Sequence, residues 1–281
     1  MINSVPPLSF VREHPDRVRT LHLPSEGLMT LPQEIFACAN LEELQIDANL
    51  LTALPPEIGG LSRLATLIVH KNQLTQLPDE LACLKNLQQL GLAGNPLTAI
   101  PAVVAQLPSL SVLGLDDTSL EDVPPWIGTL RGLRVLRLAN TFVSRLPDAI
   151  TELATLLCLC LSENAIETFP LQLPRLPGLR LLFMENCGLQ QIPPAIGQMR
   201  DLKGLNIGQN ELTEIPSEIG LLTNLQQLDL SRNKLTSLPP ELSNLTRLSD
   251  IRLGRNPIGT LAPELEAFLW RVYKGRILET W

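Results

Sequence analysis

Aliphatic residues recur along the chain with a period of 23 residues. Written in rows of 23 from Val18, residues 18–270 give eleven rows with the pattern L-x-x-L-x-L-x-x-N-x-L-x-x-L-P-x-x-I-x-x-L-x-x. The register never slips, which predicts a solenoid whose rows stack on one another. The first column of the pattern holds, after Val18, Leu41, Leu64, Leu87, Leu110, Leu133, Leu156, Leu179, Leu202, Leu225 and Leu248.

Each row begins with an alternating L-x-L segment, which predicts a short β-strand whose leucines point inward, so that stacked rows form one parallel sheet. An asparagine column follows the strand, where a carboxamide can both donate to and accept from backbone groups of a turn. Thr118, Thr141 and Cys187 replace asparagine in three rows and Glu26 in the first, so we expect a weaker ladder there. The asparagines are Asn49, Asn72, Asn95, Asn164, Asn210, Asn233 and Asn256.

A proline follows an apolar residue in the second half of ten rows, and only Ala262 interrupts this column. Proline disfavours helix in the residue before it, so each row leaves the turn in an extended form. The stretch that follows, as in Pro56 to Leu61, is too short for a long helix and predicts a 3₁₀ or irregular turn. Because these segments are bulkier than strands, stacking predicts a curved arc with the sheet on its concave face.

Both ends of the chain depart from the repeat, and the terminal rows of a solenoid need a cover for their leucines. We expect residues 1–17 to form an N-terminal flap, residues 18–270 the eleven repeats, and residues 271–281 a C-terminal cap whose helix begins near residue 263. Phe268, Trp270, Tyr273 and Trp281 concentrate at that end. An exposed aromatic docking segment is the alternative interpretation.

The repeat pattern resembles the 23-residue class of leucine-rich-repeat proteins over Val18 to Trp270. That class includes intracellular Ras-binding and Ras-suppressor scaffolds, plant Ras-group-related proteins and similar bacterial proteins. The resemblance implies an α/β solenoid, a horseshoe with a parallel concave sheet and short convex segments. It also implies that a protein partner, such as a small GTPase or another signalling protein, binds the concave face.

Composition narrows the range of partners and compartments. The formal net charge is −7, which gives no general attraction to nucleic acid or anionic membranes. No apolar run is long enough to span a membrane, and the first twelve residues lack the pattern of a Sec-type signal. The five cysteines are odd in number and four occupy ordinary repeat positions, which favours a reducing compartment over a disulfide framework.

The pattern offers little for catalysis. Cys158 and Cys160 are two residues apart on an expected strand and so share its concave face, but they supply only two of the four ligands of a structural zinc site. His70 lies four rows from Cys160, roughly 19 Å at strand spacing, too far for a Cys–His pair. Asp116 and Asp117 are interpreted as surface charges. We expect no enzyme activity, no cofactor and no metal.

The outward strand positions are those that the fold leaves free, and they predict the binding surface. An apolar patch of exposed side chains is expected in the middle rows, with a charged rim, as specific interfaces have. Phe183 and Arg137 are the types most favoured as hot spots. Mutual shielding of neighbours on the sheet is the alternative. The apolar centre is Val112, Val135, Cys158, Cys160, Leu181 and Phe183, the rim is Asp116, Asp117, Arg137, Glu163 and Glu185, and a second, basic end holds Arg232, Arg252 and Arg255.

These features predict a monomeric protein-interaction module in the cytoplasm, acting as a scaffold or regulator of signalling. A bacterial effector, delivered into a host cell without a Sec-type signal and binding or mimicking a host signalling protein, is the alternative. The two hypotheses share one mode of binding and differ in whether residues 1–17 direct secretion.

Overall fold

The computed structural model describes residues 8–273, and the chain divides into two compact units, Met1–Arg137 and Leu138–Trp281. The sequence does not predict this division, because the 23-residue register continues unbroken through Arg137 and Leu138. Each unit is described by itself. Parts of the predicted N-terminal flap and C-terminal cap, including Trp281, lie outside the described residues.

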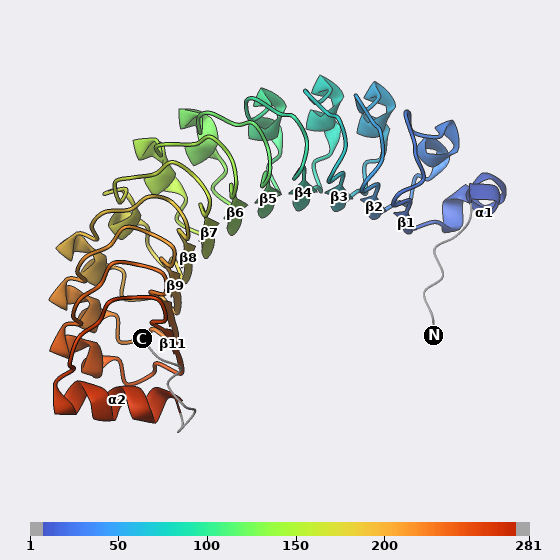
Figure 1. Cartoon of the computed structure of the whole chain (residues 1–281). Coiled ribbons are helices and arrows are strands. Elements are labelled where there is room, and N and C mark those ends of the chain that lie inside the picture. Colours follow the sequence, from blue (N-terminus) through green and yellow to red (C-terminus); the bar gives the residue numbers. More distant parts are fainter. Residues whose placement is uncertain (1–7, 274–281) are drawn as a thin grey trace. The chain divides into compact units, whose positions relative to one another are not determined.

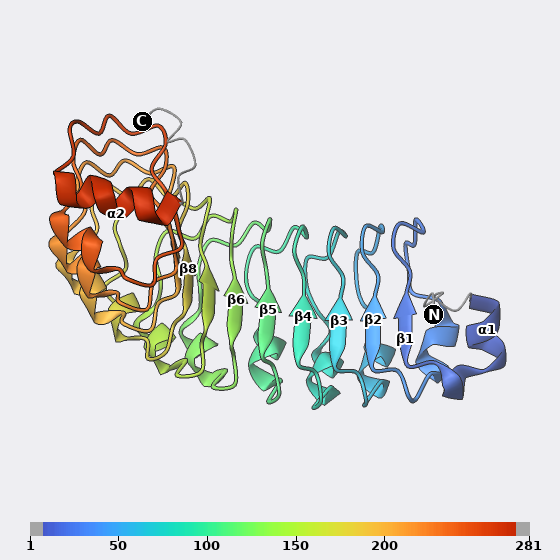
Figure 2. The ribbon, with the colours of Figure 1, turned by 90° about the horizontal axis from the view of Figure 1, so that it is seen from below.

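The first unit opens with helix α1 (Leu8–Glu13) and the short 3₁₀ helix η1 (Pro15–Arg17). Six parallel strands follow in chain order, each paired in register with the equivalent residues of the next row (Figure 2). The strands are β1 (Thr20–His22), β2 (Glu43–Gln45), β3 (Thr66–Ile68), β4 (Gln89–Gly91), β5 (Val112–Gly114) and β6 (Val135–Arg137). Between them lie the 3₁₀ helices η2 (Gln33–Ala37), η3 (Pro56–Gly60), η4 (Asp79–Cys83), η5 (Ala102–Gln106) and η6 (Pro125–Thr129).

The second unit repeats this arrangement with five parallel strands and closes with helix α2 (Pro263–Tyr273), which packs against the last row. The strands are β7 (Cys158–Cys160), β8 (Leu181–Phe183), β9 (Gly204–Asn206), β10 (Gln227–Asp229) and β11 (Asp250–Arg252). The 3₁₀ helices are η7 (Asp148–Glu152), η8 (Leu173–Arg175), η9 (Pro194–Gln198), η10 (Ser217–Leu221) and η11 (Pro240–Asn244).

Within each unit the strands line one side and the 3₁₀ helices the other (Figure 1). The leucine columns are buried. The central strand leucines, such as Leu159 and Leu182, are fully buried because they point away from the open face of the sheet. Parallel strands and short 3₁₀ segments confirm the fold class predicted from the sequence, a repeat solenoid.

The asparagine column forms a buried ladder of hydrogen bonds between rows. Asn210 is typical: its Oδ1 accepts from the backbone N–H of Cys187 at 2.9 Å and of Leu189 at 3.0 Å, and its Nδ2 donates to the carbonyl of Met184 at 2.8 Å. Where asparagine is replaced, shorter side chains make fewer bonds. The Thr118 hydroxyl donates to the Leu115 carbonyl at 2.8 Å, within its own row.

The residue before the ladder position adopts a left-handed conformation in all eleven rows. Gly94 accepts it without cost, but the other ten rows place a side-chain-bearing residue there, which costs about 1 kcal/mol each. The turn enforces this conformation so that the next residue can point inward. Four of the predicted binding residues occupy this column and are exposed: Asp117 (φ 56°), Glu163 (φ 60°), Arg232 (φ 55°) and Arg255 (φ 63°).

Candidate functional site

In the first unit, the predicted binding residues cluster on β5 and β6. Val112 pairs with Val135 across the two strands, and both side chains are half-buried. These two valines are therefore less exposed than the predicted apolar patch requires, because side chains on neighbouring strands shield each other. Arg137, on β6, keeps 54% of its side chain exposed.

Asp116 corrects a second prediction. Its side chain is only 12% exposed, so it is not a surface charge. The Arg137 Nε donates to its Oδ2 at 2.6 Å, an ion pair formed between the end of one strand and the strand of the next row. The pairing compensates the carboxylate for lost solvent. A partner approaching Arg137 therefore meets a guanidinium already held in place by Asp116.

In the second unit, Cys158 pairs with Leu181, and Cys160 with Phe183, along β7 and β8. Cys158, Leu181 and Phe183 are half-buried, whereas Cys160 is only 9% exposed and is buried, contrary to the prediction. Neither cysteine forms a disulfide. Across residues 8–273, no group of three or more His, Cys, Asp or Glu side chains converges on a possible metal position.

A hollow of about 160 Å³ opens over β8 to β11 on the outward face of the second unit. Row 9 carries glycine at the outward strand position 204, and Gly204 lines the hollow together with Asn206. A Cβ at Gly204 would lie 2.9 Å from the Leu181 Cδ2. We call this space the row-9 hollow; its lining includes Phe183, Gly204, Asn206, Gln227, Asp229, Asp250 and Arg252.

The row-9 hollow brings together two residues that the sequence analysis placed in separate candidate surfaces, Phe183 and Arg252. Arg252 pairs with Asp229 at 3.5 Å and with Asp250 at 3.8 Å. The predicted basic end is therefore a mixed cluster of both signs, a correction that follows from the aspartates on neighbouring outward positions. Arg232 and Arg255 lie in the exposed turn column of the same two rows.

Glu185 borders the row-9 hollow and fixes the orientation of Asn206. The Asn206 Nδ2 donates to the Glu185 Oε2 at 3.0 Å, and the Asn206 Oδ1 accepts from the Gly208 N–H at 3.0 Å. The Gln209 carboxamide donates to the other oxygen of Glu185. These bonds hold the polar floor of the hollow in one arrangement, which lowers the entropy cost of binding there.

Two buried groups have raised pKa values. Burial raises the pKa of the Cys187 thiol to about 11, against the opposing effect of hydrogen bonds from the backbone of Asn164 and Glu163. Burial also raises the pKa of Tyr273 to about 12, assisted by the negative charges of Asp250 and Asp229. Neither group is a candidate nucleophile, because a raised pKa keeps each protonated at neutral pH.

The sequence analysis missed the row-9 hollow as a site. The sequence signal is the glycine at residue 204, but whether a missing side chain leaves a hollow depends on the residues around it in the structure. No helix in the described part of the chain is long and apolar enough to cross a membrane.

Sequence profiles of two related families match the chain and together cover more than half of it. The profile described as "Leucine-rich repeat region" matches residues 162–264, and the profile described as "Leucine rich repeat" matches residues 39–97 and 62–120. No curated protein matches the chain in sequence.

Similar solved structures come from bacteria and plants. A leucine-rich-repeat protein of Leptospira interrogans is 28% identical, with 93% of this chain and 90% of that chain covered and a TM-score of 0.51. The plant peptide hormone receptor RGFR1 in complex with RGF2 is 31% identical, with 94% and 44% covered and a TM-score of 0.69.

The ectodomain of the Arabidopsis thaliana membrane receptor kinase GASSHO1/SCHENGEN3, in complex with CASPARIAN STRIP INTEGRITY FACTOR 2, is 28% identical, with 83% and 32% covered and a TM-score of 0.66. The chain thus spans less than half the length of either plant receptor chain. With its eleven 23-residue rows, its parallel strands and its asparagine ladder, the chain belongs to the leucine-rich-repeat proteins.

Proposed function

We propose that this protein is a non-enzymatic binding module that captures a protein or peptide partner on the outward sheet face of its second unit, across β8 to β11. The observation that carries the proposal is the row-9 hollow, which places Phe183 and Arg252 around one opening. Aromatic and arginine side chains supply most hot spots of protein interfaces.

The shape and chemistry of the row-9 hollow suit a partner side chain inserted between the rows. Phe183 gives an apolar wall, Asn206 a fixed polar floor, and Asp229 and Arg252 a charged edge. In such an arrangement the apolar surface supplies affinity, and the charges at its edge fix the position of the partner. The two plant receptors similar to this chain were solved as complexes, with RGF2 and with CASPARIAN STRIP INTEGRITY FACTOR 2, which supports a binding role.

In the second unit, we propose that Cys158, Leu181, Glu163 and Glu185 extend the proposed surface, with Cys160 contributing by packing. The first unit carries a separate candidate surface of its own. We propose that it consists of Val112 and Val135, with Arg137, Asp116 and Asp117 as charged neighbours.

The cellular role proposed from the resemblance is a monomeric signalling scaffold or regulator in the cytoplasm, with a small GTPase or another signalling protein as partner. The second candidate role is a bacterial effector that acts on a host signalling protein. The chain is similar over 90% of that chain's length to a bacterial leucine-rich-repeat protein, from Leptospira interrogans, which is consistent with a bacterial source. Fusing residues 1–17 to a reporter and measuring its export separates the two roles.

Affinity capture tests the proposal directly. Immobilised wild-type protein, a Phe183→Ala variant and a Phe142→Ala variant are incubated with the same lysate, and bound proteins are identified by mass spectrometry. Phe142 is a matched control, because it is 67% exposed in the same unit but follows the ladder position rather than lying on a strand. A partner lost only from Phe183→Ala supports the proposal; identical captures from all three contradict it.

A further inference from the structure

Row 7, residues 156–178, interrupts the regular geometry of the second unit. In rows 6, 8, 9 and 10, the 3₁₀ helices η7, η9, η10 and η11 begin directly after the proline of the repeat. In row 7 the helix η8 begins only at Leu173, three residues after Pro170, and Pro174 follows within it. The row therefore leaves its turn by a longer path, which exposes Leu171 to 65%.

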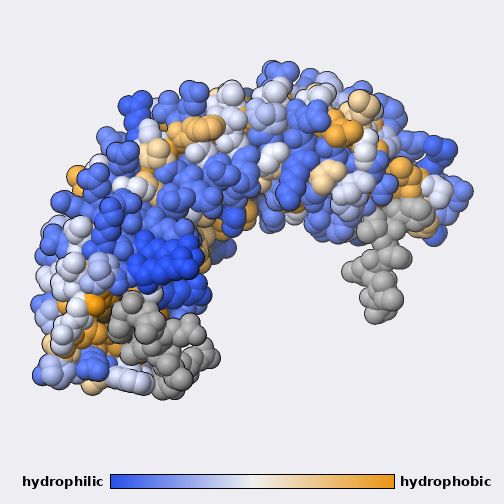
Figure 3. Space-filling view, viewed as in Figure 1, coloured by the Kyte–Doolittle hydropathy of each residue, from blue (hydrophilic) through white to orange (hydrophobic). Residues whose placement is uncertain are grey.

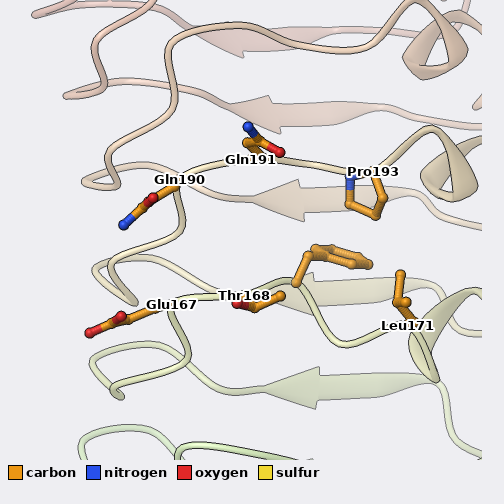
Figure 4. Close-up of a pocket in the computed structure, with 7 residues that line it drawn as sticks. Glu167, Thr168, Leu171, Gln190, Gln191 and Pro193 are labelled. Carbon is orange, nitrogen blue, oxygen red and sulfur yellow. The ribbon is translucent and has the colours of Figure 1, made fainter.

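This irregular row opens a pocket of about 360 Å³ beside row 8, away from the strands. Glu167 and Thr168 come from row 7 and Gln190 and Gln191 from row 8, while Leu171 and Pro193 lie at the other end of the opening (Figure 4). Phe169 stands where other rows carry leucine, isoleucine or valine; it lines the pocket and is buried. We call this space the lateral pocket.

The polar end of the lateral pocket is available to a ligand. The side chains of Glu167, Thr168, Gln190 and Gln191 are exposed, and none makes a hydrogen bond or ion pair with another group in residues 8–273. By contrast, Gln172 of the same row donates to Asp148 at 3.0 Å and is held away. A carboxamide both donates and accepts, as a backbone amide requires.

The charge of the lining is one-sided. Glu167 is the only ionisable residue among the described residues that line the pocket, so a cation is favoured and a carboxylate ligand disfavoured. The apolar end, formed by Phe169, Leu171 and Pro193, gains from burial of an apolar side chain. The face of the molecule shown in Figure 3 is largely hydrophilic, with hydrophobic residues in separate spots.

We infer that the lateral pocket binds an extended segment of a partner polypeptide in which an apolar side chain is followed by lysine or arginine. The apolar side chain packs on Phe169 and Leu171, the main chain bonds to the Gln190 and Gln191 carboxamides, and the cation pairs with Glu167. The volume lies at the lower end of the range for ligand pockets, about 300–1,000 Å³. This site is separate from the row-9 hollow and goes beyond the proposed function.

The probes are two blocked peptides, acetyl-Ala-Phe-Lys-Ala-amide and acetyl-Ala-Phe-Glu-Ala-amide, titrated to millimolar concentration into the ¹⁵N-labelled full chain. The readout is the pair of side-chain amide signals of Gln190 and Gln191, identified by single alanine substitutions. The lysine peptide is expected to shift both signals saturably, and the glutamate peptide to bind at least about fivefold more weakly.

Variants connect the shifts to the pocket. Glu167→Gln should weaken the lysine peptide up to about fivefold and remove its preference over the glutamate peptide. Leu171→Ala should weaken both peptides by about threefold or more, because apolar contact is lost. The matched controls Glu152→Gln and Leu221→Ala change an exposed glutamate and an exposed leucine outside the lining, and should bind as wild type.

Three results would overturn the inference: no saturable shift of the Gln190 and Gln191 signals, equal affinity for the two peptides, or unchanged affinity in both Glu167→Gln and Leu171→Ala. The Phe183→Ala variant distinguishes this site from the proposed function. It should leave peptide binding at the lateral pocket unchanged even if it abolishes capture on the sheet face.

Discussion

Removing one asparagine from the buried ladder should destabilise the second unit far more than removing an exposed one. In Asn210→Ala, the N–H groups of Cys187 and Leu189 lose the Oδ1 that accepts from them, and the carbonyl of Met184 loses its donor. Asn210 is the only hydrogen-bond partner for these three groups in the part of the chain described. The Ile207 carbonyl is less affected, because Asn233 also donates to it at 3.0 Å.

The expected magnitude follows from counting those groups. A buried donor or acceptor left without a partner costs about 1–3 kcal/mol. Cys187 is 1% exposed, and Met184 and Leu189 are fully buried, so water reaches them poorly. Three such groups predict a loss of about 3 kcal/mol or more in the free energy of unfolding. That is a large share of the stability of an ordinary domain, about 5–15 kcal/mol.

Urea denaturation followed by circular dichroism measures the loss, and amide hydrogen exchange of Cys187 and Leu189 localises it. Asn224→Ala is the matched control: its Nδ2 donates to the Arg200 carbonyl at 2.9 Å and its Oδ1 accepts from Arg247 at 2.7 Å, and both hydrogen bonds are exposed to solvent. That variant should change stability by less than about 1 kcal/mol. A loss below about 1 kcal/mol in Asn210→Ala, or slow exchange retained at both amides, would refute the hydrogen-bond account of the ladder.

Further substitutions test packing and titration. Gly220→Ala should lower the free energy of unfolding by about 1–3 kcal/mol, because the new Cβ would clash with the Glu241 carbonyl oxygen. Gly254→Ala is the control and should be nearly neutral, because the space beside Gly254 is open. Thermal melts of the two variants measure the difference. Cys187 keeps its proton in the folded state up to a pKa of about 11, whereas the ordinary value is 9.0. The contribution of the protonated thiol to the free energy of unfolding is therefore complete below pH 9 and is lost as the pH rises from 9 to 11. Over that pH range, the urea midpoint should fall less in Cys187→Ala than in the wild-type protein. Leu159→Asp puts a charge into the fully buried leucine column and should abolish the cooperative transition of the second unit, and a retained transition would contradict the row register.

The regular parts of the fold could be predicted from the sequence because the same constraint recurs in every row. Leu159 and Leu182 are buried for one reason, the inward side of a strand, so the pattern identifies both the strand and its register. Prolines such as Pro147 and Pro193 predict the start of the 3₁₀ helices in the same way. Because the pattern recurs in eleven rows, it predicts the fold even where a single row departs from it.

The candidate site was only partly predictable, because its features depend on pairs of rows rather than on one. The buried Asp116 pairs with Arg137, one row later, and the positive charge of Arg252 is offset by the negative charges of Asp229 and Asp250. The left-handed column escaped prediction because it holds eleven residues of many types. The row-9 hollow depends on the missing side chain of Gly204, and its effect can be judged only from the neighbouring side chains of Leu181 and Gln227 in the structure.

The central claim, that the row-9 hollow receives a partner side chain, is tested most directly by filling it. Gly204→Leu is suited to this, because rows 5, 6 and 8 carry valine or leucine at that outward position and the nearest atom, the Leu181 Cδ2, belongs to a flexible side chain. A larger residue in a strand should also preserve or raise the melting temperature. The measurement is the dissociation constant of peptides selected from a phage-displayed library on the wild-type protein. We predict that Gly204→Leu weakens them more than about tenfold at an unchanged melting temperature, the scale of a lost hot spot. Equal affinity in the filled variant, with the fold intact, would contradict the account.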